Sequence, residues 1–119
     1  SYGLSEEEMA AMLYASYANA REDMETRLRI QAEVDARQML TMLQTALERD
    51  GALLDAAGRS EIEISAANLQ QSLQKPSRDA ILAAMEQLEN VARPFAEMRV
   101  NAALKNALAG KTVETVETL

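Results

Sequence analysis

Carboxylates are the side chains here that could do chemistry, because Asp and Glu number 19 while His and Cys are absent. Clustered carboxylates can hold a pair of iron or manganese ions in a helical bundle, but such sites use inward-facing Glu-x-x-His pairs. Without histidine, the acidic clusters at Glu6–Glu8 and at Glu61 and Glu63 are better explained as a helix start and a solvated face. We therefore expect no metal ligands in this chain.

Other catalytic chemistry is also missing. The absence of Cys and His excludes disulfides, common zinc sites, cysteine-ligated iron–sulfur clusters and imidazole catalysis. No Gly-rich loop of the GxxxxGK or GxGxxG kind is present, so we expect no nucleotide site. Ser5 and Ser60 have no base that would activate them and are better explained as helix N-caps. We expect no catalytic residues and no cofactor-binding residues.

Charge and hydropathy exclude two classes of partner. The formal net charge is −7, and an acidic surface repels phosphates, so we expect no nucleic-acid binding. No apolar run reaches the roughly 18 residues of a membrane span, and no Lys/Arg cluster suggests a membrane-binding patch. The lack of Cys is compatible with the cytoplasm, where we expect the protein to work.

The composition predicts an all-α fold. Hydrophobic residues make up 48% of the chain but aromatics only 3%, and the Ala, Leu and Met among them favour helix over sheet. Ser5 and Glu8 form a capping box, and no Gly or Pro follows until Gly51, a natural C-cap. We predict a long N-terminal helical arm over about residues 5–50.

This arm has two alternative descriptions. Asn19 with Glu22 repeats a weaker cap pattern, which favours a hinge between Asn19 and Asp23. Nothing there breaks a helix outright, so the alternative is a continuous helix of about 70 Å at 1.5 Å per residue. The sequence leaves both open.

Beyond Gly51 the sequence predicts a small antiparallel helical bundle. Asp55 or Ser60 caps the next helix and Ser77 caps another. Pro94 either kinks that helix or starts a further one at its first turn.

The second half of the arm must join these helices, which sets the bundle at about residues 36–110. Gly110 is the expected C-cap, and residues 111–119 are an expected frayed tail. We treat residues 1–119 as one helical unit.

Apolar residues recur at helical spacing along the first part of the arm: Met9, Leu13, Tyr17 and Met24, which we call the arm stripe. The stripe extends beyond the reach of the shorter helices, so a surface outside the bundle should cover it. We expect isolated copies to self-associate through it as a homodimer. From these patterns alone, the protein is an acidic helical module that binds protein, and an autonomous scaffold or adaptor is one interpretation.

The stretch SYGLSEEEMAAML…ANAREDM resembles the start of the C-terminal lid of a DnaK-type heat-shock chaperone. The order that follows also fits, with a long helix to LERDGALL, then DAILAAMEQLE, then a closing helix. Within that family, SYGL, DGALL and RPFAEMRVNAALKNALAGKTVETV are most similar to the HscA branch, which serves iron–sulfur cluster assembly.

The resemblance implies a lid that closes over a peptide-binding β-sandwich of the same full-length chain and slows peptide release. It implies that this sandwich and an ATPase domain, with ATP and magnesium, lie upstream of Ser1. Through those domains the longer protein would work with an iron–sulfur scaffold protein and a J-domain co-chaperone.

The resemblance also points to contact residues. Met39 and Leu40 align with a leucine pair that would lie over the peptide site; the alternative is that they join the bundle core. The family's lid latch, a carboxylate and a His, falls on Arg37 and Thr41, so it is not carried over. The reversed charge at Arg37 could instead pair with an acidic loop of the sandwich.

Overall fold

The computed structural model describes residues 3–117 and the side chains of residues 3–111. Helix α1 spans Glu6–Asp50, the 3-10 turn η1 spans Gly51–Leu53, α2 spans Ala56–Ser72 and α3 spans Arg78–Glu117. Residues 3–117 contain no strand, so the all-α prediction is confirmed.

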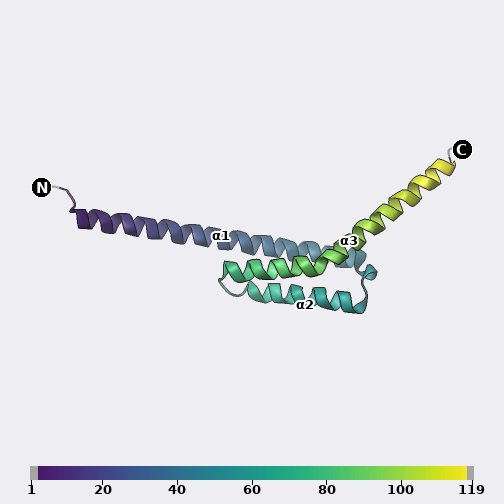
Figure 1. Ribbon diagram of the computed structural model, residues 1–119, viewed down its shortest axis with the longest axis horizontal. Coiled ribbons are helices and arrows are strands. Elements are labelled where there is room, and N and C mark those ends of the chain that lie inside the picture. The colour runs from purple at the N-terminus through teal and green to yellow at the C-terminus, as the bar shows by residue number, and fades with distance from the viewer. Residues whose placement is uncertain (1–2, 118–119) are drawn as a thin grey trace.

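The three helices form a bundle from which the two long helices project (Figure 1). Helix α2 runs back from the end of α1, and α3 returns in the direction of α1. The molecule measures 95 × 36 × 17 Å, with a radius of gyration of 24.6 Å. A compact chain of this length would have a radius of gyration of about 13 Å. Much of the chain therefore lies outside any shared core.

Helix α1 begins where the capping box predicts. The hydroxyl of Ser5 accepts a hydrogen bond from the backbone N–H of Glu8 at 3.1 Å. Beyond it the helix is unbroken through Asn19 and Asp23, so the structure has the continuous alternative and not the hinge. The physical reason is that no Gly or Pro interrupts this stretch, and an ion pair between Arg21 and Glu25 at 3.2 Å spans it.

The bundle core follows a seven-residue repeat. Ile81, Leu88 and Phe95 are fully buried at steps of seven along α3, and Ile62 and Leu69 are their counterparts on α2. Helix α1 contributes four buried residues: Ala32, Ala36, Ala46 and Leu47. This spacing keeps one seam of each helix against its neighbours, as in coiled coils. Leu43, Leu54, Leu73 and Val91 are among the half-buried residues that pack around it.

Two further helix starts agree with the sequence. The Asp55 carboxylate accepts from the backbone N–H of Gly58 at 2.7 Å, so Asp55 caps α2 and Ser60 does not. Ser77 Oγ accepts from the backbone N–H of Ala80 at 3.2 Å at the start of α3. Pro94 lies inside α3 without ending it.

The end of the chain differs from the prediction. The buried apolar core begins at Ala32 and ends at Phe95, whereas the bundle was expected to begin at about residue 36 and end at about residue 110. Helix α3 continues to Glu117, so Gly110 is an interior helical residue and not a C-cap. No glycine in the described chain has a positive φ, which a left-handed C-cap would require. The frayed tail expected at 111–119 is thus helical to Glu117, and residues 118–119 lie outside the described part.

Candidate protein-contact surface

The part of α1 that precedes the bundle, residues 6–28, is exposed at every position. We call it the free segment. The arm stripe lies on it, with Met9 50%, Leu13 69%, Tyr17 66% and Met24 62% exposed. None is enclosed by α2 or α3. Large apolar side chains in a contiguous exposed row mark a surface that contacts another protein.

The mean direction of the arm stripe is turned away from the bundle-facing side of α1, but the two faces overlap, since Tyr17 points within about 20° of the buried Ala46. At about 100° per residue, Leu13 points about 140° away from Ala36, and Met24 about 120° away from it. The rotation arises because apolar residues step by four along much of this helix, and each such step turns the face by about 40°. The stripe is exposed because this part of α1 extends beyond α2 and α3, as Figure 1 shows.

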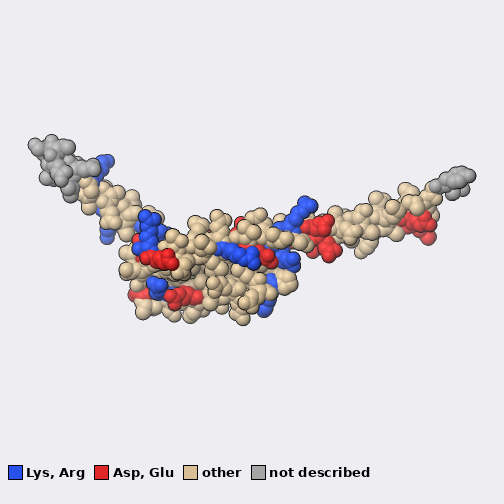
Figure 2. Space-filling model, turned by 180° about the vertical axis from the view of Figure 1, so that it is seen from behind, with Lys and Arg blue, Asp and Glu red and all other residues tan. Residues whose placement is uncertain are grey.

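The free segment is also uncharged over much of its length. Residues 9–20, MAAMLYASYANA, contain no charged side chain, although 26% of the chain is charged. Figure 2 shows this uncharged stretch between the acidic residues near the start of α1 and the mixed charges around the bundle. A neutral helix with an apolar row loses little solvation energy when another surface covers it.

The other predicted contact residues lie on the bundle part of α1. Met39 and Leu40 are both half-buried and pack against the core, and Met39 also lines an open apolar groove between α1 and α3, so their contact with an outside surface stays a prediction. Arg37 is exposed, and no ion pair involves it within the described part of the chain. Its backbone carbonyl accepts a hydrogen bond from Thr41 Oγ1 at 3.0 Å. Met39 and Leu40 therefore lie on a different part of α1 from the arm stripe.

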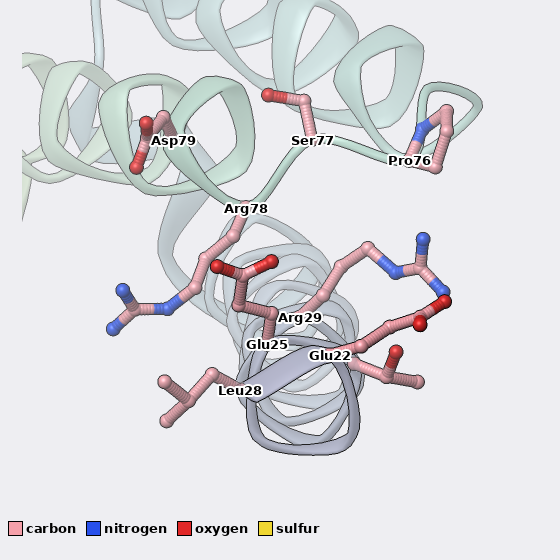
Figure 3. A pocket seen from close by; sticks show the side chains of 9 residues that line it. Glu22, Glu25, Leu28, Arg29, Pro76, Ser77, Arg78 and Asp79 are labelled. Carbon is pink, nitrogen blue, oxygen red and sulfur yellow. The ribbon is translucent and has the colours of Figure 1, made fainter. Parts of the chain in front are cut away.

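A hollow of about 480 Å³ lies where the free segment meets the bundle. Figure 3 shows Glu25 and Arg29 pointing from α1 toward the connection that carries Ser77 and Arg78. Nearby, Arg29 Nε lies 3.8 Å from Glu33 Oε1 and has no hydrogen-bond partner. Both acidic and basic groups line the hollow, which suits a joint between elements better than a site for one charged ligand.

There are two further apolar surfaces, on which sequence reasoning singled out only Met39 of the first as a contact residue. One is a groove between α1 and α3, lined by Met42, Leu43, Ala92 and Phe95 among others. The other is on α3 beyond the bundle, where Val100 and Leu104 are exposed. Leu104 points about 180° away from the core face at Phe95. The spacing of Val100, Leu104 and Leu108 by four was the signal available in the sequence.

Within the described residues, no group of three or more His, Cys, Asp or Glu is placed to hold a metal ion. No helix in that part is long and apolar enough to cross a membrane.

Known proteins resemble this chain in sequence over most of its length. A sequence model of the Hsp70 protein family matches residues 1–101. The chain belongs to the Hsp70 family. Among relatives of this Hsp70 chain, the chaperone protein HscA homolog of Verminephrobacter eiseniae is 42% identical over 116 residues. The HscA homolog of Variovorax paradoxus and the chaperone protein HscA of Xenorhabdus nematophila are each 39% identical over the same length.

These matches cover 98% of this Hsp70 chain but 19% of each of the three relatives. The chain therefore spans about a fifth of the length of the curated relatives it matches. It is a helical region of an HscA-like chaperone.

Proposed function

We propose that this chain is the lid of the substrate-binding region of an HscA-type chaperone. In this proposal the free segment of α1 lies on a peptide-binding β-sandwich, and the bundle closes over the bound peptide. A closed lid blocks the exit of the peptide, so it acts mainly on the dissociation rate.

One observation carries this proposal: the arm stripe is exposed and lies on the part of α1 that extends beyond α2 and α3. Burying a large apolar side chain gains about 1.5–3 kcal/mol in full. Because the stripe residues are half to two-thirds exposed, closure would gain about 1–2 kcal/mol for each. Several such contacts together keep the lid closed. Their total free energy is still small enough for the binding of a second ligand to offset it.

The client and the partners follow from the resemblance in the sequence. We propose that the bound peptide belongs to the scaffold protein on which iron–sulfur clusters are assembled, in the cytoplasm. ATP with magnesium would bind in a separate ATPase domain of the longer chain, where a J-domain co-chaperone also acts. ATP binding would open the lid by favouring a state in which the stripe is undocked.

Truncation tests the lid role. In the complete chaperone, we compare the release of a fluorescent client peptide with and without residues 5–119. We expect release to be at least about tenfold faster without the lid, since each 1.4 kcal/mol of lost contact is a factor of ten. Equal dissociation rates would remove the gating role.

A further inference from the structure

Methionine supplies all the sulfur of this chain, which has seven Met and no Cys. The Met side chains differ sharply in exposure. Met9, Met12, Met24 and Met42 on α1 are each half or more exposed. Met39 and Met85 pack against the core. A dissolved oxidant therefore reaches the sulfurs of these four residues more readily than those of Met39 and Met85, and Met98 on α3 is intermediate at 41% exposed.

Two of these exposed residues, Met9 and Met24, lie at the ends of the arm stripe. At about 100° per residue they point within about 60° of one another, with Leu13 and Tyr17 between them. Met12 is equally exposed but points about 100° away from the middle of the stripe. Two of the four exposed thioethers on α1 thus lie on the apolar row, and the other two, Met12 and Met42, lie outside it.

We propose that Met9 and Met24 are oxidation sites through which a hydroperoxide prevents this surface from docking. The inference rests on the proposed lid function. In the reaction the thioether sulfur attacks the outer oxygen of the hydroperoxide. An S=O bond forms as the O–O bond breaks, sulfur gives up two electrons, and the proton leaves with the other oxygen as water or an alcohol.

The sulfoxide changes the contact because it places a polar oxygen on the apolar row. Docking would bury that oxygen where the neighbouring stripe residues offer only carbon atoms, apart from the Tyr17 hydroxyl. Burying a polar group without a hydrogen-bond partner opposes docking. A docked lid shields both sulfurs, so oxidation occurs from the open state and traps it. Methionine sulfoxide reductases reverse the change.

The test uses the complete chaperone and hydrogen peroxide as the oxidant. Wild type, the double variant Met9→Leu/Met24→Leu and the control Met12→Leu are each oxidised, and mass spectrometry gives the sulfoxide fraction at every Met. Release of a fluorescent peptide is then measured before oxidation, after it, and after treatment with the reductases MsrA and MsrB. Leu keeps the apolar character of Met without the sulfur, and the effect of oxidation on each protein is measured against the release rate of that same protein before oxidation.

We expect oxidised wild type and oxidised Met12→Leu to release peptide at least about tenfold faster, and the reductases to restore the original rate. The double variant should release peptide at the same rate before and after oxidation. The proposal is overturned if Met9 and Met24 carry sulfoxide and release is unaltered, or if the double variant responds as strongly as wild type.

A companion variant separates this inference from the lid itself. Leu13→Ser/Tyr17→Ser removes apolar contacts without involving sulfur. If that variant releases peptide faster while oxidation does nothing, the lid function stands and the oxidation site is wrong. If neither change alters release, both proposals fail together.

Discussion

Arg99 of α3 donates a hydrogen bond from Nε to Oδ2 of Asp50, the last residue of α1, at 2.8 Å. Its guanidinium also lies 5.9 Å from the ring centre of Phe95, the last buried core residue of α3. The pair therefore joins the end of α1 to the point at which α3 leaves the bundle. Both side chains are about one-third exposed, which limits the strength of the contact.

The Asp50–Arg99 pair should contribute modestly and in a salt-dependent way. A double-mutant cycle with Asp50→Asn and Arg99→Met should give a coupling free energy of about 0.5–1 kcal/mol at low salt. The coupling should shrink in high salt, because exposed charges are screened over about 10 Å at 0.1 M ionic strength. Urea unfolding measures it, and a coupling that is zero at low salt would contradict the structural role.

The buried seam should dominate the stability of the bundle. Replacing the fully buried Leu88 by Ala should lower the free energy of unfolding by about 2–5 kcal/mol, through lost burial and a residual cavity. Leu104→Ala is the matched control, since that side chain is exposed beyond the bundle, and it should change stability by about 0.5 kcal/mol or less. Similar effects at the two positions would mean that the core is misplaced.

Gly110 offers a direct check on the end of α3. Apart from its chain neighbours and the surrounding helix backbone, no atom among the described residues lies within 4 Å of a Cβ added there, and the backbone is helical. Gly110→Ala should therefore raise helicity and stabilise the extension by about 1 kcal/mol, the difference in helix propensity. Circular dichroism and amide exchange of residues 100–111 measure this. Lower helicity in the variant would contradict the helical Gly110 of the structure and support the C-cap predicted from the sequence.

Local signals in the sequence located the helix starts and the core. Ser5, Asp55 and Ser77 each cap a helix because a short polar side chain can reach the free backbone N–H groups of a first turn. The core on α3 could likewise be read from apolar residues at helical spacing, such as Ile81 and Leu88.

Signals for breaks were less reliable. Asn19, Pro94 and Gly110 all resemble boundaries, yet each lies inside a helix. A single unfavourable residue costs about 1–3 kcal/mol, which the rest of a long helix can offset, so breaks depend on the whole element.

The isolated chain should self-associate through the arm stripe. The exposed stripe has no cover within residues 3–117, and pairing two copies would remove it from water. Sedimentation at rising concentration should show a monomer–dimer equilibrium that Leu13→Ser/Tyr17→Ser weakens. Tyr14→Ser is the control, because Tyr14 is 75% exposed but points about 100° away from the middle of the stripe. A monomer at every concentration would contradict the prediction.

The most direct measurement is peptide release from the complete chaperone carrying Leu13→Asp/Tyr17→Asp, compared with Tyr14→Asp. Charges on the arm stripe should oppose docking and speed release by at least about tenfold, because a buried unpaired carboxylate is strongly unfavourable. The charge at Tyr14 should leave the rate within about twofold of wild type, since an exposed substitution away from the contact changes little. Unchanged release from the stripe variant, or an equal effect at Tyr14, would contradict docking through this face of α1.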